Sequence, residues 1–278
     1  MNILERIHAA YFQLTAAERK VADFVLSHHG QVQFMSITQL ADECGIADAT
    51  VSRFCRRLEL QGFNAFKIEL AKHSVPTGNN RTREESLDTQ TGRAAEVAQI
   101  NSDAIQQTLG LLEPERLLQA VQLFEKADHV LCIGAGGSMI MARECAHLFS
   151  TVGAPFFALA DSHLQMSAVA TMSNTGAIML FSYSGATTSG LEVLELAKQR
   201  GIPTILVTRF HKSPAAKLAT VVLRCGSNEG PFQFGSVPAR IAQLTVLDVL
   251  FHEYCHRNRA QCEQNVEKIA AALAGKHV

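Results

Sequence analysis

Hydroxyl-bearing residues gather at one point of the chain, directly after a short apolar run at residues 177–181. The segment that follows contains five serines and threonines at Ser182, Ser184, Thr187, Thr188 and Ser189. Hydroxyls and the backbone amides at a helix N-terminus can together hold a phosphate without any lysine. For this loop alone, the plainer alternative is a Ser/Thr-rich turn that caps the next helix.

A second loop of this kind follows an earlier apolar run at residues 129–134. It reads Gly134-Ala135-Gly136-Gly137-Ser138, so glycines let the backbone approach a ligand while Ser138 offers a donor. The Gly-x-Gly spacing also fits a dinucleotide-binding loop, with Asp161 placed as the ribose-binding acid, but Met139 stands where the third glycine belongs. Two hydroxyl-bearing loops at the ends of adjacent strands favour a phosphorylated ligand.

Near the N-terminus, residues 39–58 fit a helix-turn-helix motif. Ala41 is small where the two helices must touch, and Gly45 can adopt the backbone conformation that a tight turn needs. The space between the helices is filled by four apolar residues, Leu40, Ile46, Val51 and Phe54. The second helix is therefore predicted to be a DNA-recognition helix.

The outward face of this second helix is basic. Its predicted DNA-binding residues are Thr50, Ser52, Arg53, Arg56 and Arg57, which can read a groove or bind phosphates. The plainer alternative is a solvated helix face in an ordinary bundle, and residues 1–75 do balance 8 Lys/Arg against 8 Asp/Glu. DNA binding is the preferred prediction because the turn signature and the basic face coincide on one helix.

The elements that position these loops differ between the two halves of the chain. Residues 1–75 predict consecutive short helices, with capping boxes at Thr15/Glu18 and Ser36/Gln39. Residues 76–91 are polar and have the composition of a linker. We therefore expect an all-α helix-turn-helix domain over 1–75 and a second domain over 92–278.

The second domain is predicted to be an α/β three-layer fold with a five-stranded parallel sheet. Helical patterns at 93–112 and 114–127 precede five short apolar runs, at 129–134, 154–159, 177–181, 204–207 and 221–223. Helix-length segments separate these runs, which is the rhythm of βαβ units. Ligands bind at the carboxyl ends of the strands in such sheets.

Composition excludes several classes of protein. The 278 residues are 47% apolar and 18% charged, which disfavours a disordered chain, and the net charge of −1 gives no global attraction to nucleic acid. The seven cysteines contain no C-x-x-C pair, so reduced thiols are expected rather than a disulfide framework. No signal peptide and no run of 18 apolar residues is found, so we expect a soluble, cytoplasmic protein.

Taken together, these motifs resemble the RpiR-type bacterial transcription regulators, which join a helix-turn-helix domain to a sugar isomerase (SIS) domain. The resemblance covers nearly the whole chain. It is carried by Glu18–Asp23, Thr50–Cys55, Gly62-Phe63, Phe66-Lys67, Gly134–Ser138, Ser182–Gly185 and Ser213–Ala219.

The resemblance implies which residues bind an effector. Ser138, Ser182, Ser184 and Thr187 would contact the phosphate of a phosphosugar, and Gly137 would permit its close approach. His163, after the second strand, and Glu229, after the fifth, would face sugar hydroxyls, although His163 could equally be a capping or core histidine. Arg240 could ion-pair with Glu229 or reach the ligand, from its own or a neighbouring subunit. No catalytic residue, cofactor or metal is expected.

The resemblance also implies a mode of action. A homodimer or higher homo-oligomer would bind an inverted-repeat operator, and the phosphosugar would change that binding. Repression relieved by the ligand is the expected sign. Among such regulators the chain is most similar to those of amino-sugar or sialic-acid catabolism, for which N-acetylmannosamine 6-phosphate would be the effector. No residue spacing separates this compound from glucosamine 6-phosphate, N-acetylmuramic acid 6-phosphate or a phosphogluconate derivative.

Two enzyme readings compete with a regulator. A phosphosugar aldose/ketose isomerase would use Glu229 as the base that moves a proton between C1 and C2, but such an enzyme has no evident use for residues 1–75. Residues 252–256 also match H-E-x-x-H, the pattern of a zinc protease. No strong third ligand follows, so a polar helix end is the preferred interpretation.

Overall fold

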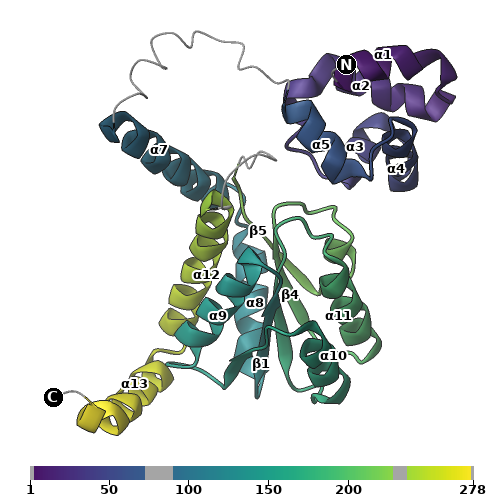
Figure 1. The fold of residues 1–278 in the computed structure, drawn as a ribbon. Helices are drawn as coiled ribbons and strands as arrows, with labels where there is room; N and C mark the ends of the chain where they lie inside the picture. Colours follow the sequence, from purple (N-terminus) through teal and green to yellow (C-terminus); the bar gives the residue numbers. More distant parts are fainter. Residues whose placement is uncertain (1–2, 73–89, 228–236, 277–278) are drawn as a thin grey trace. The chain divides into compact units, whose positions relative to one another are not determined.

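The computed structural model describes residues 3–72, 90–227 and 237–276, and the chain divides into two compact units (Figure 1). The division falls inside one helix, between Ile100 and Asn101. Most of the predicted linker at 76–91 lies outside the described residues. Its last two residues, Gln90 and Thr91, already belong to a helix that begins three residues earlier than expected.

The first unit is helical, as predicted, and no strand occurs among residues 3–72. Its elements are α1 (Ile3–Ala10), the 3-10 turn η1 (Tyr11–Gln13), α2 (Ala16–Val32), α3 (Ile37–Cys44), α4 (Asp48–Arg57) and α5 (Phe63–Ala71). Both capping boxes are present: the Thr15 hydroxyl accepts from the Glu18 amide, and the Ser36 hydroxyl accepts from the Gln39 amide. Because each cap satisfies amides that have no partner inside the helix, the starts of α2 and α3 are fixed by sequence.

The second unit alternates helices and strands after two initial helices. The first of these, α7 (Gln90–Leu109), is the helix that the division crosses. The elements after it are, in chain order, α8 (Pro114–Lys126), β1 (Val130–Gly134), α9 (Gly137–Phe149), β2 (Phe156–Ala158), α10 (Ser162–Thr171), β3 (Ala177–Phe181), α11 (Thr188–Gln199), β4 (Thr204–Thr208), η2 (Ala215–Lys217), β5 (Val221–Arg224), α12 (Val237–Arg257), α13 (Arg259–Leu273) and η3 (Ala274–Lys276). All five predicted strands are present, and every pairing between them is parallel. The predicted fold class is therefore confirmed.

The order of the strands in the sheet is β2-β1-β3-β4-β5. The chain leaves β1 toward one edge to form β2 and then returns to build β3 on the other side of β1. In doubly wound sheets this reversal separates the two loops that follow the flanking strands, and ligands bind in the crevice between them. Gly134 and Phe181 are register partners, so the loops after β1 and β3 begin at the same level.

Helices cover both faces of the sheet and give the three predicted layers (Figure 1). On one face, side chains of α8, α9 and α12 pack on the strands, and Phe149 contacts the rings of Phe124, Phe156, Phe251 and Tyr254 with centroids 4.8–5.5 Å apart. On the other face, α10 and α11 pack over Ile178, Leu180 and Leu206. Strands that are buried on both faces have continuous apolar sequences, which is why they could be predicted from the sequence.

Gly185 determines the path of the loop after β3. Its φ of +61° lies in the left-handed region, and a Cβ placed on it would lie 2.1 Å from the Ser213 hydroxyl oxygen. Its amide donates to the Ser182 carbonyl at 3.0 Å, and its carbonyl accepts from the Ala215 amide at 3.0 Å. This glycine therefore clamps the Ser182–Ser184 segment against the loop after β4.

Gly185→Ala is expected to destabilise the protein by about 3 kcal/mol, because it adds the cost of left-handed backbone to a collision with buried Ser213. Gly201→Ala is the matched control. Gly201 also has a positive φ, +70°, but a Cβ there meets nothing within 4 Å, so a loss of only about 1 kcal/mol is expected. Urea unfolding followed by circular dichroism measures both losses, and equal losses would contradict the proposed clamp.

Candidate functional site

A pocket lies at the carboxyl ends of β1 and β3, where the strand order reverses. It is lined by residues from the loops after both strands and from three helices: Gly134, Ala135, Ser138, Gln165, Leu180, Phe181, Ser182, Thr187, Ser189 and Gly190. None of these ten residues carries a charge. Ser138, Ser182 and Thr187 were predicted to bind phosphate, and the structure places all three around this pocket.

The loop after β1 turns directly into α9. A Cβ on Gly134 would lie 2.6 Å from the Ser138 carbonyl oxygen, so only glycine lets the chain turn back this tightly. Gly136, with a φ of +55°, precedes the first residue of α9, Gly137. The Ser138 hydroxyl is half-buried and accepts from the side-chain amide of Gln243 at 3.4 Å.

The loop after β3 places three hydroxyls at the start of α11. Ser182 is buried, and its Oγ lies 3.5 Å from Oγ1 of Thr187, the N-cap residue of α11. Ser184 is exposed, and its Oγ accepts from the Ala186 amide at 3.3 Å. The Thr187 hydroxyl makes no capping bond to its own helix, so the plain capping role considered from the sequence is not the one it performs.

This arrangement suits an anion that accepts many hydrogen bonds. Both α9 and α11 begin beside the pocket, with 13 and 12 residues, and the N-terminus of each presents backbone amides and partial positive charge. Ser138, Ser182 and Thr187 add hydroxyl donors. With no charged residue in the lining, the pocket would hold an anion by hydrogen bonds and helix dipoles alone.

The other predicted effector residues that the structure describes do not line this pocket. His163 is exposed in the first turn of α10, whose N-cap is Asp161; the Asp161 carboxylate accepts from the Leu164 amide at 2.9 Å. Asp161 therefore has a structural role that the dinucleotide alternative did not foresee. Arg240, on α12, has its Cδ 3.7 Å from the point where a Cβ on Gly137 would lie. Glu229 lies outside the described residues.

Two buried glutamines, Gln165 and Gln243, support the pocket and were not predicted. Gln165, on α10, donates to the carbonyls of Leu159 at 2.7 Å and Gly134 at 3.4 Å. Gln243, on α12, is the donor to Ser138. Each glutamine precedes a buried apolar residue by four positions, Val169 and Leu247, so an amide inside an apolar helix stripe was the available signal.

In the first unit, α3 and α4 form the predicted helix-turn-helix. Gly45 ends α3 with a φ of +62°, and the following Ile46 amide donates to the Ala41 carbonyl at 2.9 Å. This hydrogen bond reaches back over the left-handed glycine and closes the end of α3, as in a Schellman-type cap. Buried Thr38 on α3 also donates to the Asp48 carboxylate at 2.9 Å, which ties α3 to the first residue of α4.

The two faces of α4 divide as the sequence predicted. Val51, Phe54 and Cys55 are buried against the other helices. Of the predicted DNA-binding residues, Arg53, Arg56 and Arg57 are exposed, while Thr50 and Ser52 are half-buried. A helix with this exposed basic face has the form that enters a DNA major groove.

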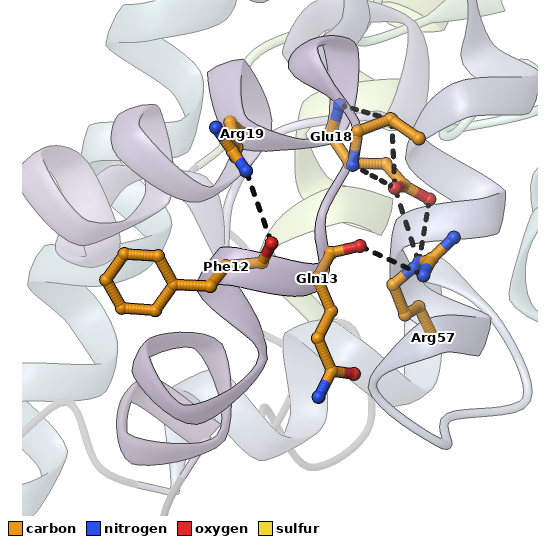
Figure 2. Close-up of polar contacts among 6 residues, drawn as sticks. Phe12, Gln13, Glu18, Arg19 and Arg57 are labelled. Atoms are coloured by element: carbon orange, nitrogen blue, oxygen red, sulfur yellow. Dashed lines mark hydrogen bonds and ion pairs between the residues drawn. The ribbon is translucent and has the colours of Figure 1, made fainter.

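Arg57 differs from the other two arginines because its guanidinium is engaged within the unit (Figure 2). Its Nε lies 3.3 Å from both carboxylate oxygens of Glu18, and its Nη1 donates to the Gln13 carbonyl at 3.2 Å. The Glu18 side chain is only 4% exposed, and that of Arg57 is 42% exposed. These contacts join the last residue of α4 to the first turn of α2, 39 positions earlier in the chain.

The environment of Glu18 favours its ionised form. Burial is the largest single effect and raises the pKa of this carboxyl, but the hydrogen bonds from the Thr15 amide and hydroxyl and the Arg57 guanidinium together outweigh it. The net result is a pKa below the ordinary value. The carboxylate therefore stays charged in the folded unit.

Other patterns that drew attention in the sequence have structural explanations. His252, in the H-E-x-x-H run, is 75% exposed on α12 and lies 3.5 Å from the Asp248 carboxylate. Within residues 3–72, 90–227 and 237–276, no group of three His, Cys, Asp or Glu side chains could hold a metal ion. All seven cysteines are free thiols. No described helix is both long enough and apolar enough to cross a membrane.

Comparison with known proteins matches both units to families. Residues 1–76 match the helix-turn-helix domain of the rpiR family, and residues 123–253 match the SIS domain. A helix-turn-helix transcriptional regulator of Caldanaerobacter subterraneus is 32% identical over 254 residues, covering 90% of this chain and 89% of the relative. The regulator HexR of Escherichia coli is 29% identical, covering 98% and 94%. The solved structure of Vibrio vulnificus NanR complexed with ManNAc-6P has a TM-score of 0.87 and 27% identity, covering 100% of both chains.

The low pKa of Glu18 predicts an acid-sensitive helical unit. Its carboxylate contributes full stability above the ordinary glutamate pKa of about 4.3, and this contribution is lost as the pH falls through the lower folded-state value. Glu18→Gln keeps a side-chain oxygen for the capping box but removes the titration. We expect the free energy of unfolding to fall less steeply below about pH 4.3 in the variant. Identical pH profiles for the two proteins would contradict the assignment.

Proposed function

Because this chain belongs to the RpiR family of helix-turn-helix transcriptional regulators and carries a SIS domain, we propose that it represses genes of amino-sugar or sialic-acid catabolism. A phosphosugar bound in the SIS domain relieves this repression. The observation that carries the proposal is the uncharged, hydroxyl-lined pocket at the junction of β1 and β3, in a chain that also presents a basic recognition helix.

The phosphate of the effector binds between the N-termini of α9 and α11. Ser138, Ser182, Ser184 and Thr187 donate to its oxygens, and Gly137 leaves room for it beside the start of α9. Support comes from the short strand-to-helix turns at Gly134 and Gly185, which hold these hydroxyls at one edge of the sheet. We assign the contacts to the sugar to His163, Arg240 and Glu229, the last of which lies outside the described residues.

N-acetylmannosamine 6-phosphate is the effector we favour. The solved NanR structure, which covers the whole chain at a TM-score of 0.87, is a complex with ManNAc-6P. The regulator HexR is similar to this chain at 29% identity, against 27% for NanR, so sequence identity alone does not single out one effector. Other hexosamine phosphates are therefore competitors to be measured beside it.

On DNA, α4 enters the major groove and a homodimer or higher homo-oligomer reads an inverted repeat. Thr50, Ser52, Arg53 and Arg56 are the proposed contacts, since none of these side chains is buried, whereas Val51 and Phe54 of the same helix are. Effector binding and DNA binding are linked through the assembly, with a reciprocal coupling of about 1–3 kcal/mol. The effector therefore lowers operator affinity, and the operator lowers effector affinity by the same factor.

A fluorescence-anisotropy titration with the DNA upstream of this chain's own gene tests the proposal, run with and without a panel of hexosamine phosphates. Saturable binding that one sugar phosphate weakens is the expected result. A phosphosugar isomerase would behave differently: it would bind no DNA and would consume a sugar phosphate over time.

Arg53→Ala should weaken operator binding about tenfold or more, because an exposed recognition-helix arginine loses its base or phosphate contact. Effector binding should not change, since Arg53 belongs to the other unit. Lys126→Ala, which removes a charge from the end of α8, is the control for lost charge alone. Unaltered operator affinity in Arg53→Ala would contradict the recognition-helix assignment.

Replacing Ser182 and Ser184 together by alanine should abolish the effect of the sugar phosphate on DNA binding. Operator affinity without effector should stay at the wild-type level, because neither serine lies in the helical unit. Isothermal titration calorimetry with the responsive sugar phosphate measures the lost affinity directly. A double variant that still responds fully would refute this site.

A further inference from the structure

The C-terminal end of the recognition helix is held by charged side chains from the two helices that precede the motif. Glu18 of α2 binds the Arg57 guanidinium, and Arg6 of α1 donates to the carbonyl of Leu58, the residue that ends α4. Arg6 also lies 3.6 Å from the carboxylate of Glu59. These contacts occur where the chain leaves α4, opposite to the end that Thr38 and Asp48 secure.

Both carboxylate oxygens of Glu18 are engaged at this point. One carboxylate oxygen accepts from both the Thr15 amide and the Thr15 hydroxyl at 2.9 Å, and both oxygens lie 3.3 Å from Nε of Arg57 (Figure 2). The same carboxylate thus completes the N-terminal cap of α2 and binds the last residue of α4. One buried anion therefore links the start of α2 to the end of α4.

A buried negative charge beneath a DNA-binding helix opposes the approach of a phosphate backbone. Neutralising an acidic residue in a DNA-binding domain should strengthen binding if only the overall field matters. Glu18 therefore opposes DNA binding electrostatically, and its contact with Arg57 on α4 points to a structural role that offsets this effect. A recognition helix must hold its side chains within a fraction of an ångström of their base and phosphate contacts.

We propose that Glu18 and Arg57 act as one positioning unit that sets the orientation of α4 on α2, so that Arg57 contributes to DNA binding through Glu18 and not through a DNA phosphate. This inference rests on the proposed DNA binding by α4. It replaces the direct contact predicted for Arg57 from its place on the helix. Arg53 and Arg56 remain the arginines that face DNA.

Glu18→Gln gives the first test, because the expected sign is opposite to that of simple electrostatics. Glutamine at this position still caps α2, so the helix start is retained while the ion pair is lost. We expect operator affinity to fall about tenfold, although the domain has lost a negative charge. Glu43→Gln, which neutralises an exposed acidic residue on α3, is the matched control and should leave affinity unchanged or raise it.

A double-mutant cycle with Arg57→Gln gives the second test. If the two residues act as a unit, the Glu18→Gln/Arg57→Gln protein should lose no more affinity than either single variant. The slope of log affinity against log salt should also stay at the wild-type value, since no phosphate contact disappears. Arg57→Lys should bind the operator as weakly as Arg57→Gln does, because a lysine ammonium cannot replace a guanidinium that binds Glu18 and the Gln13 carbonyl at once.

All titrations use the full-length chain and the DNA upstream of its own gene, at a temperature where circular dichroism shows every variant folded. Independent losses that multiply in the double variant, a salt slope reduced by about one, or rescue by Arg57→Lys would each overturn the positioning role. Wild-type affinity in Glu18→Gln would overturn it as well. If the wild-type chain itself binds no DNA, the proposed function fails first, which separates that outcome from a failure of the inference alone.

Discussion

The order in which strands join the sheet determines where the second unit can bind a ligand. Because β1 pairs with β2 on one side and β3 on the other, the loops after β1 and β3 diverge to opposite faces and leave a crevice between them. Every feature of the pocket depends on this reversal. The two helix N-termini meet there, the serines of both loops face the same space, and Gln165 and Gln243 reach it from helices on opposite faces of the sheet.

At two points of this molecule, glycine lets one segment of the chain come closer to another than any side chain would allow. Gly134 does so against Ser138, and Gly185 does so against Ser213. Gly45 instead supplies left-handed backbone with open space around it, where α3 must end before α4. Close packing of loops and a tight turn between helices are thus different demands that the same residue type meets.

Much of this architecture could be predicted because it depends on local pattern. The strand at 177–181 was located to the residue, and the helix caps at Thr15 and Ser36 were read from pairs three positions apart. The serines of the pocket followed from their place after buried strands. What could not be predicted depends on contacts between distant positions. Gln243 meets Ser138 across 105 residues, and no spacing rule connects them. Arg57 looked like its exposed neighbours until the fold brought Glu18 to it.

Because the lining of the pocket carries no charge, the two units of the chain should differ in how strongly ionic strength affects their ligand binding. Contacts between arginines and a DNA backbone weaken steeply as salt rises, because binding releases counterions. Binding of an anion in a pocket built from hydroxyls and backbone amides releases few counterions, so the affinity for the anion depends mainly on hydrogen-bond geometry. Under the proposed function, a rise in ionic strength would weaken the binding of DNA while leaving the binding of the sugar phosphate largely unchanged, so the concentration of sugar phosphate needed to clear the DNA would fall as the ionic strength rises.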